Sequence, residues 1–427
     1  MRALLAAFCL TGCMSVCLAA KDSCVECHGA LEGGQGDPVR KFARDVHKRH
    51  GFSCADCHGG DPQRDDAEAA MSPAHGFRGK IARTAVPQLC ARCHSDARLM
   101  HQYNPRQRVD QLAQYLTSNH GKRLAAGDTA VANCVDCHSV HDIRTTKDPL
   151  SPVHPLRLPD TCAHCHADAS RMQKYKLSAT VHEDYRTSVH WKALADRGDL
   201  SAPSCASCHG NHGAAPPNVG EVAAVCGTCH VMLEDLYRES PHKPVFDAMG
   251  VAGCVACHEN HAVMHPTPEL LDGENGICAN CHEAESAGGQ TAAGMAKLIG
   301  GLSAEIARSD SVLSQARRSG MEVSEALLRH TQAQEQLVMA RVAVHAFRVD
   351  AVGEPVQEGL AIARETHAAG LSALEELDRR RTGLVFSLVA IGLTILGLWL
   401  WIRGFERKHH SMAPPGSRSG TGEGLGG

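Results

Sequence analysis

The pattern of hydrophobic and polar residues along the chain shows an apolar run at each end. The first, Met1 to Ala20, has one early positive charge, a continuous apolar stretch and small residues at its end, which is the plan of a secretory signal peptide. We expect cleavage near Ala20. The tetrapeptide Leu10-Thr11-Gly12-Cys13 offers lipoprotein processing at Cys13 as an alternative. Both interpretations predict that the rest of the chain is exported.

The second apolar run, Leu384 to Ile402, contains no charged residue over 19 positions. As a helix it spans about 28 Å, close to the roughly 30 Å hydrocarbon core of a bilayer. Trp399 and Trp401 stand next to basic residues that begin at Arg403, as is typical of a membrane interface. The run predicts one transmembrane helix, followed by a cytoplasmic, disordered tail over residues 403–427.

Between residues 291 and 383 apolar positions recur at helical spacing, as in the stripe Leu298, Leu302 and Ile306. Breaks at Ser319-Gly320 and at Gly353-Glu354-Pro355 predict three helices, the last able to continue into the membrane helix. This region predicts a helical stalk or small bundle. Its histidines, His330, His345 and His367, are interpreted as residues of the polar faces.

Residues 21–290 follow neither pattern, and composition indicates why. The chain has 21 cysteines and 28 histidines but only 3 tryptophans, 5 tyrosines and 8 phenylalanines, too few for an ordinary aromatic core. Its net charge of −4 offers no basic surface for nucleic acid, so no nucleic-acid partner is expected. Something other than side chains must fill the interior.

Eighteen of the cysteines form pairs with two residues between them, and a histidine follows each pair directly. The nine resulting motifs are Cys24, Cys27, His28; Cys54, Cys57, His58; Cys90, Cys93, His94; Cys134, Cys137, His138; Cys162, Cys165, His166; Cys205, Cys208, His209; Cys226, Cys229, His230; Cys254, Cys257, His258; and Cys278, Cys281, His282. The other three cysteines lie within the apolar run at residues 1–20.

Covalent haem attachment explains this spacing. Two thiols add to the two vinyl groups of one haem, and the next residue points its imidazole at the iron. Zinc or redox Cys-x-x-Cys pairs are the alternative, but they leave the fixed histidine unexplained. The sequence therefore predicts nine covalently attached haem c groups with the motif histidines as iron ligands. They would pack together as the core of a mainly α-helical domain with many loops, over residues 21–290.

A two-motif unit repeats three times, at about 118–166, 188–230 and 240–282. Each copy reads Ser-x-His, then Cys-x-x-Cys-His-x-x-His, then a second Cys-x-x-Cys-His. The spare histidines are candidates for the second axial position on iron. The three copies supply His120, His141, His190, His212, His242 and His261.

The region before the repeats follows a looser version, with His47 or His50 before Cys54 and His75 before Cys90. His182, within Thr180-Val181-His182, resembles the Ser-x-His tripeptides. We therefore predict His47, His75 and His182 as the remaining distal ligands, and the sequence leaves open which of the nine serves which iron. Nine bis-histidine haems would have low potentials and no open coordination position.

These motifs, from Cys24 to His282, resemble those of the periplasmic multihaem c-type cytochromes with doubled CxxCH motifs, the class III or cytochrome c3-like family. The resemblance implies bis-histidine ligation, a helical and loop-rich fold, and electron transfer. With the membrane helix it predicts a single-pass protein of the bacterial inner membrane, with the haem domain in the periplasm, that carries electrons in anaerobic respiration. Redox proteins or a membrane quinol oxidoreductase are the expected partners. Tetrahaem quinol dehydrogenases usually have an N-terminal anchor, whereas the predicted anchor here is C-terminal.

The alternative function is a reductase of nitrite, hydroxylamine or a similar small oxyanion. Related nitrite reductases attach their catalytic haem through CxxCK, and this sequence contains no such motif. Catalysis would need a haem without a distal histidine, and the one at His28 has the fewest candidates nearby. An electron carrier is therefore the preferred interpretation over an enzyme, and a haem-based sensor is disfavoured by the short tail.

Overall fold

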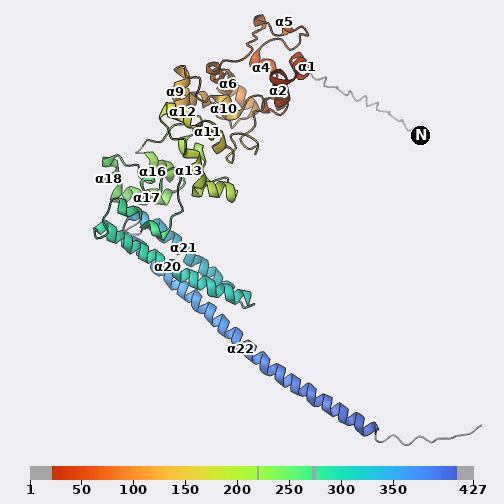
Figure 1. Ribbon diagram of the computed structural model, residues 1–427, viewed down its shortest axis with the longest axis vertical. Coiled ribbons are helices and arrows are strands. Elements are labelled where there is room, and N and C mark those ends of the chain that lie inside the picture. The colour runs from red at the N-terminus through yellow and green to blue at the C-terminus, as the bar shows by residue number, and fades with distance from the viewer. Residues whose placement is uncertain (1–21, 219–220, 272–275, 411–427) are drawn as a thin grey trace, which may run out of the picture. The chain divides into compact units, whose positions relative to one another are not determined.

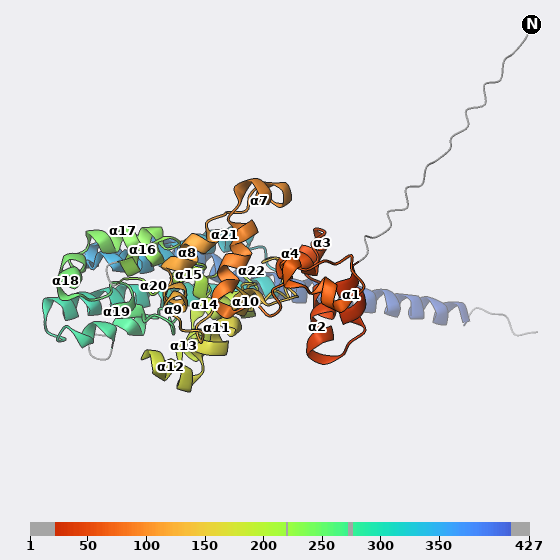
Figure 2. The same ribbon diagram turned by 90° about the horizontal axis from the view of Figure 1, so that it is seen from above.

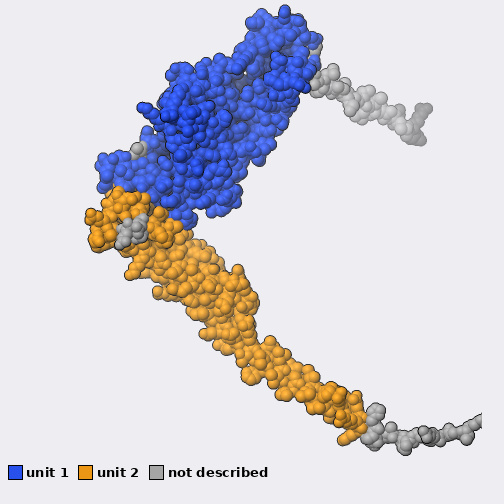
Figure 3. All heavy atoms as spheres, viewed as in Figure 1, with its two compact units in different colours: residues 1–231, 244–266 blue, residues 232–243, 267–427 orange. Residues whose placement is uncertain are grey.

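The computed structural model describes residues 22–218, 221–271 and 276–410, and within these ranges the chain forms helices and loops without a strand. The mainly α-helical, loop-rich fold predicted from the sequence is confirmed. Figure 3 shows two compact units, residues 1–231 with 244–266 and residues 232–243 with 267–427. The predicted signal peptide and the tail after residue 410 lie outside the described residues.

The first unit is a succession of short helices joined by loops (Figures 1 and 2). In chain order they are α1 (Ser23–Gly29), α2 (Gly33–Phe42), α3 (Val46–Arg49), α4 (Cys54–His58), α5 (Ala67–Ala70), η1 (Pro73–His75), η2 (Arg83–Ala85), α6 (Val86–His94), α7 (Ala97–Tyr103), α8 (Gln111–Thr117), α9 (Asn119–Ala125), α10 (Cys134–His138), α11 (Leu158–His166), α12 (Ala169–Tyr175), α13 (Val181–Thr187), α14 (Val189–Trp191), η3 (Lys192–Asp196), α15 (Cys205–His209), α16 (Val222–Gly227) and α19 (Val255–His258). The chain passes between units within α17 (Val231–Glu239), within α18 (His242–Met249) and again between Pro266 and Thr267.

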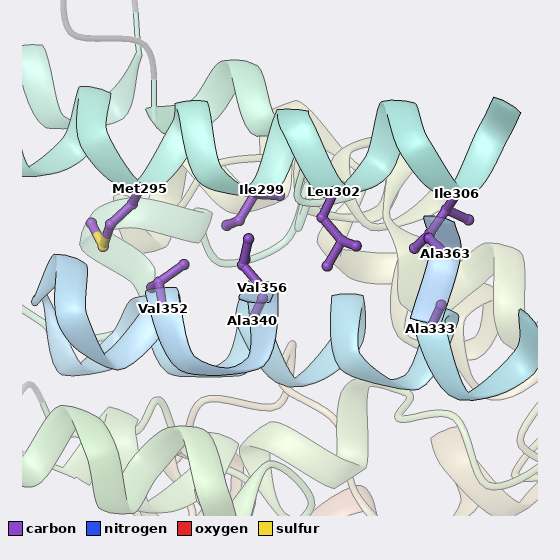
Figure 4. Close-up of a cluster of buried hydrophobic side chains, with 9 residues drawn as sticks. All are labelled: Met295, Ile299, Leu302, Ile306, Ala333, Ala340, Val352, Val356 and Ala363. Carbon is purple, nitrogen blue, oxygen red and sulfur yellow. The ribbon is translucent and has the colours of Figure 1, made fainter. Parts of the chain in front are cut away.

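The second unit contains a bundle of three long helices that run side by side in Figure 1. They are α20 (Ala287–Arg318), α21 (Ser324–Ala343) and α22 (Val349–His410), preceded by the short turns η5 (Pro268–Leu271) and η6 (Ile277–Asn280) and interrupted by η7 (Val344–Ala346). Figure 4 shows the core, in which side chains of α20 meet those of α21 and α22. Both hydrophobic clusters found in the described part of the chain lie in this bundle.

The three helices approach closely because small residues face the core. Ala333, Ala340 and Ala363 are fully buried in the main cluster. A Cβ on Gly359 would lie 2.9 Å from a methyl group of Leu302 and 3.0 Å from Cβ of Gln336, so an alanine there would force these helices or side chains to shift. The bundle thus has an ordinary side-chain core, whereas the cysteine-rich unit buries only scattered hydrophobic residues.

The predicted helix breaks are half right. The first falls at Ser319-Gly320, immediately after α20. The predicted second break at Gly353-Glu354-Pro355 is wrong, because α22 already begins at Val349 and runs through Pro355. The observed break lies at Phe347, which adopts a left-handed conformation with φ 54°. Val352 and Val356 are fully buried on either side of the proline, and this packing outweighs the hydrogen bond that the proline removes.

The last part of α22 extends beyond the bundle. In the described part of the chain α22 is the one helix long and apolar enough to cross a bilayer, and its most apolar window has a mean hydropathy of 2.3 with no buried residue. The large side chains from Leu384 to Ile402 are exposed. A long exposed apolar surface of this kind is expected where lipid, rather than water, surrounds the helix.

Candidate haem-attachment sites

The nine motifs are numbered here as sites 1 to 9 in chain order. Sites 2, 4 and 6 share one local design, a five-residue helix formed by the motif itself: α4, α10 and α15. The residue before each first cysteine, Ser53, Asn133 or Ser204, caps the helix through a reciprocal capping box. This cap lets so short a helix form at all.

The residue after the motif histidine then turns the chain sharply. Gly59, Ser139 and Gly210 follow sites 2, 4 and 6 with φ of 72°, 70° and 76°, a region that favours glycine. At site 4 this turn precedes His141, and at site 6 it precedes His212. This turn therefore explains why the histidine three residues beyond the motif histidine lies away from the helix that the motif forms.

The Ser-x-His tripeptides are helix junctions. The hydroxyl of Ser118 donates to the Tyr115 carbonyl at 2.6 Å, which closes α8, and accepts from the Gly121 N–H at 2.9 Å, which starts α9. Ser188 makes the equivalent bonds to the Tyr185 carbonyl and the Trp191 N–H. The serine is thus an N-cap that fixes the following histidine in the first turn of the next helix.

Seven motif histidines have a second histidine ring beside them at almost constant distance. The ring centroids of these pairs are between 6.0 and 6.4 Å apart. The pairs are His58 with His141, His94 with His47, His138 with His212, His166 with His120, His209 with His261, His230 with His190, and His282 with His242.

This separation is the one that a bis-histidine iron needs. A metal–imidazole bond is about 2.0–2.1 Å. Two such bonds, plus about 1.1 Å from each ligating nitrogen to its ring centre, give about 6.3 Å between centroids. Two imidazoles joined by a direct hydrogen bond of about 2.9 Å would have centroids only about 5.1 Å apart. In the described part of the chain, the residues present therefore fit a haem iron between the rings of each of these pairs.

Comparison with known families identifies the cysteine-rich region. Residues 46–167 and 198–283 match the family described as Cytochrome c3. The chain is a cytochrome c3-like multihaem cytochrome. No solved structure matches it. The matched segments contain eight of the nine motifs, and only site 1, at Cys24 to His28, lies outside them. Covalently bound haem c and electron transfer follow from this family.

The ring pairs of the cytochrome obey two rules. A Ser-x-His histidine pairs with the second motif after it, as His120 precedes site 4 and faces His166 of site 5. The histidine after a motif pairs with a site two earlier, as His212 follows site 6 and faces His138 of site 4. His190 and His242 follow the first rule, and so does His47, although Asp45 stands in the place of the serine. His141 and His261 follow the second.

The two rules give different ring orientations. At sites 2, 4 and 6 the paired imidazoles are nearly parallel, with interplanar angles of 23°, 14° and 19°. At sites 3, 5, 7 and 9 they are inclined by 86°, 67°, 37° and 82°. Because ring orientation sets the splitting of the iron d orbitals, the even and odd sites are expected to differ spectroscopically.

The surroundings of the rings favour metal binding. Burial lowers the pKa of His138 to about 4, with smaller contributions from His212 and His94, so the imidazole stays neutral, which is the ligating form. His58 donates through Nδ1 to the Gly79 carbonyl at 2.8 Å. This bond orients the ring and leaves Nε2 free for iron.

His47 has a charged partner, which the sequence alone did not reveal. Asp45 is 1% exposed, and its carboxylate lies 2.8 Å from Nδ1 of His47. The same carboxylate accepts the Ile143 N–H at 2.7 Å, and these hydrogen bonds outweigh burial and lower the pKa of Asp45. A carboxylate on Nδ1 gives the ring more imidazolate character and makes it a stronger donor to iron.

Two predicted distal ligands are not brought to a motif histidine. His182 instead bonds through Nε2 to Asp160 at 3.0 Å. Thr180 does not cap α13 as Ser188 caps α14, so Thr180-Val181-His182 resembles the Ser-x-His tripeptides in sequence but not in structure. His75 ends η1, and no histidine ring faces it or His28 within the described ranges. His50, the alternative to His47, contacts Tyr103.

Site 9 belongs to the second unit and packs on the bundle. His282 follows η6, and the Cβ that an alanine would add at Gly288 of α20 would lie 2.4 Å from Nδ1 of His282. The ring of Phe347, at the α21–α22 junction, lies 4.0 Å from that of His242. Nothing in the sequence pointed to Phe347 or Gly288, whereas a Tyr-x-x-Ser-x-His pattern that begins at Tyr115, Tyr185 and Tyr237 could be read from it.

Proposed function

We propose that this cytochrome is a nine-haem electron conduit of anaerobic respiration, anchored by α22 in the inner membrane of a bacterium with its haems in the periplasm. The order of the attachment sites carries the proposal. Motifs that follow one another in the sequence are also neighbours in the first unit, so its sites form a row. Each bound haem would supply an iron that cycles between the ferric and ferrous states, and electrons would hop from one to the next.

Three contacts join sites in pairs within this row. Interaction with the Cys134 thiol, ahead of burial, raises the pKa of Cys90, which brings sites 3 and 4 together. Cys205 raises the pKa of Cys162 in the same way, at sites 5 and 6, and Cys254 that of Cys226, at sites 7 and 8. These sulfur atoms stand where thioether sulfurs would hold the haem edges, so adjacent cysteines mean adjacent haems.

The intervening steps are also short. Burial, followed by the charge of Cys90, raises the pKa of Cys57, which places sites 2 and 3 side by side. Burial and the charge of Cys226 likewise raise the pKa of Cys208, at sites 6 and 7. Burial, with smaller contributions from Asp22 and Cys24, raises the pKa of Cys54 to about 11, at sites 1 and 2. Burial, followed by the charges of Asp136 and Cys165, raises the pKa of Cys137, at sites 4 and 5. Short steps therefore join sites 1 to 8, as hopping over several haems requires.

Anchoring rests on α22. Trp399 lies near the end of its exposed apolar segment, and the guanidinium of Arg403 lies 4.3 Å from the centre of that indole ring. Tryptophan with a neighbouring arginine is typical of the interface between lipid and water. Export by a signal peptide would place the haem sites on the outer side of the membrane.

Removing one site from the middle of the row tests the proposal. In film voltammetry the wild type should reduce and oxidise nine haems, a number that intact mass would report independently. The double variant Cys134→Ser/Cys137→Ser, which lacks site 4, should slow exchange between the two ends by orders of magnitude. His101→Ala, an exposed histidine outside every pair, is the matched control and should behave as the wild type. Undiminished exchange without site 4 would refute a row.

One observation favours a second function, reduction of nitrite, hydroxylamine or a similar small oxyanion. Such chemistry needs a haem with an exchangeable sixth ligand, and in the described part of the chain no histidine ring pairs with His28 of site 1. Carbon monoxide binding to one haem, abolished by Cys24→Ser/Cys27→Ser, would support this function. If carbon monoxide binds no haem, site 1 is closed and the reductase proposal fails.

A further inference from the structure

The bundle of the second unit sets the distance between site 9 and the apolar part of α22, which is proposed to enter the membrane. Site 9 lies at one end of the bundle, since Gly288 starts α20 and Phe347 immediately precedes α22. The exposed apolar segment begins at Leu384, further along the same uninterrupted helix. The distance between them is therefore set by helix geometry.

From Val349 to Leu384 the helix advances 35 residues (384 − 349), which is about 52 Å at 1.5 Å per residue. A tilt of about 20°, the average for membrane helices, reduces this height only to about 49 Å, and a tilt of about 40° to about 40 Å. No cysteine follows Cys281, so no further attached haem lies along this path. Electron tunnelling decays exponentially with distance, and a gap of several haem widths stops it.

The bundle is braced along most of this length, which keeps the distance fixed. Near site 9, Val352 packs in the main cluster, and at the far end Leu313 and Val323 pack against Leu374. Between these layers the buried hydroxyls of Ser309 and Thr366 share a hydrogen bond of 2.8 Å. A polar pair buried in a helical core helps to hold the register of its helices. A slip would break this bond and leave the Ser309 hydroxyl buried without it, although Thr366 would keep its bonds to the carbonyls of Ile362 and Ala363.

We propose that this bundle is a spacer that holds site 9 beyond the reach of quinol dissolved in the bilayer, so that site 9 exchanges electrons with a redox protein that docks above the membrane. This inference rests on the proposed function, in particular on α22 as the anchor. Each encounter passes one electron: the partner's own one-electron centre is oxidised and the iron of site 9 is reduced, or the reverse.

The distance is tested first, on the full haem-loaded protein in vesicles of phosphatidylethanolamine and phosphatidylglycerol. A nitroxide on a non-natural side chain at position 384 should lie about 50 Å from site 9 by pulsed electron paramagnetic resonance. The signal of site 9 is identified by its loss in Cys278→Ser/Cys281→Ser. A label at exposed Asp350 is the control and should lie within about three helical turns of site 9, about 16 Å. A distance from position 384 below about 30 Å would overturn the spacer.

A core substitution tests whether the bundle maintains this distance. Leu302 is fully buried at its centre, whereas Leu328 on α21 is 68% exposed. Leu302→Asp should broaden the distance distribution and shorten its mean, and Leu328→Asp should leave both unchanged. If Leu302→Asp lowers the helical circular dichroism but the distance stays sharp, the bundle does not set the height and the proposal fails.

The partner class is tested in a variant that isolates site 9, Cys254→Ser/Cys257→Ser, which removes site 8. A pre-reduced small soluble cytochrome should reduce site 9 at least tenfold faster than a long-chain quinol confined to the bilayer. Equal rates, or a faster quinol reaction, would overturn the proposal. Failure of the wild type to float with the vesicles would instead refute the anchor, and incomplete reduction of the wild type by the soluble cytochrome would refute the conduit.

Discussion

Replacement of Gly288 by alanine is expected to disturb site 9 and no other site. Gly288 lies in the first turn of α20, where its backbone touches the imidazole of His282. An added Cβ would lie 2.4 Å from Nδ1 of that ring and 2.6 Å from its Cγ. Both atoms are part of a rigid ring, so the ring must move as a whole.

The size of the effect follows from these distances. Ordinary contact begins at 3.4 Å, so the ring must move by about 1.0 Å (3.4 − 2.4). That is half the length of a metal–imidazole bond of about 2 Å, and the bond to iron is expected to weaken or break. Overpacking of this kind costs about 1–3 kcal/mol. It outweighs or cancels the roughly 0.5–1 kcal/mol that alanine contributes in a helix relative to glycine.

Gly300 provides the matched control, because it lies in the same helix and a Cβ there would meet no atom within 4 Å. Gly300→Ala should therefore raise the free energy of unfolding by about 0.5–1 kcal/mol and leave every haem low-spin. Gly288→Ala should show one haem's worth of high-spin signal in electron paramagnetic resonance and melt at a lower temperature than the control. The expected difference is about 2–4 °C for each kcal/mol.

Three results would refute this reasoning. The first is a Gly288→Ala protein whose haems are all low-spin and which melts with Gly300→Ala. The second is a high-spin signal in both variants. The third is loss of more than one low-spin haem in Gly288→Ala, since only His282 contacts the added methyl group among the motif histidines.

Three further predictions concern single side chains. Asp45→Asn should raise the reduction potential of site 3, because the ring of His47 loses its charged hydrogen-bond acceptor. Loss of such a partner typically weakens metal affinity tenfold to hundredfold. If only the ferric state is weakened, the potential measured by potentiometric titration should rise by about 60–120 mV. His212→Ala should open the sixth position of site 4, so that carbon monoxide binds one haem and a species with nearly parallel imidazoles is lost. Burial lowers the pKa of His330, against a smaller opposing contribution from Asp310, so in mild acid the unfolded state binds the extra proton and the free energy of unfolding falls as pH drops below about 6.5. His330→Leu should remove that pH dependence from denaturant unfolding followed by circular dichroism.

Each of these has its own contrary outcome. An unchanged potential of site 3 in Asp45→Asn would show that the hydrogen bond to His47 does not tune the iron. In a background that lacks site 4 through Cys134→Ser/Cys137→Ser, His212→Ala should add no carbon monoxide binding. Any added binding would assign His212 to another haem. An acid slope retained by His330→Leu would place the titrating group elsewhere in the bundle.

His330 also shows that the pattern of polar and apolar residues does not always predict which side chains of a helix are buried. The sequence suggested a polar-face residue, but its side chain is buried, with 4% of the residue exposed. The helical period was right, and the face was misjudged because the core of this bundle accepts a layer of polar groups, such as Ser309 and Thr366, among its alanines and leucines. Burial of a ring at that layer depends on α20 and α22, which the sequence of α21 does not contain.

What the sequence determined by itself is local chemistry. Two thiols and an imidazole within five consecutive residues indicate haem attachment whatever the surrounding fold, so all nine motifs could be recognised from the sequence. The apolar length of α22 was readable for the same reason, since a helix of that length and composition needs no tertiary partner to be recognised.

The tertiary structure decided everything that joins one module to another. His138 is faced by His212 rather than by the nearer His141, because the turn after Ser139 directs His141 toward His58 of an earlier site. His182 has the right neighbours in sequence but lacks the serine cap, and it faces Asp160 instead. A second axial ligand is a contact between distant residues, and its distance is set by how helices pack, which no spacing within a single segment specifies.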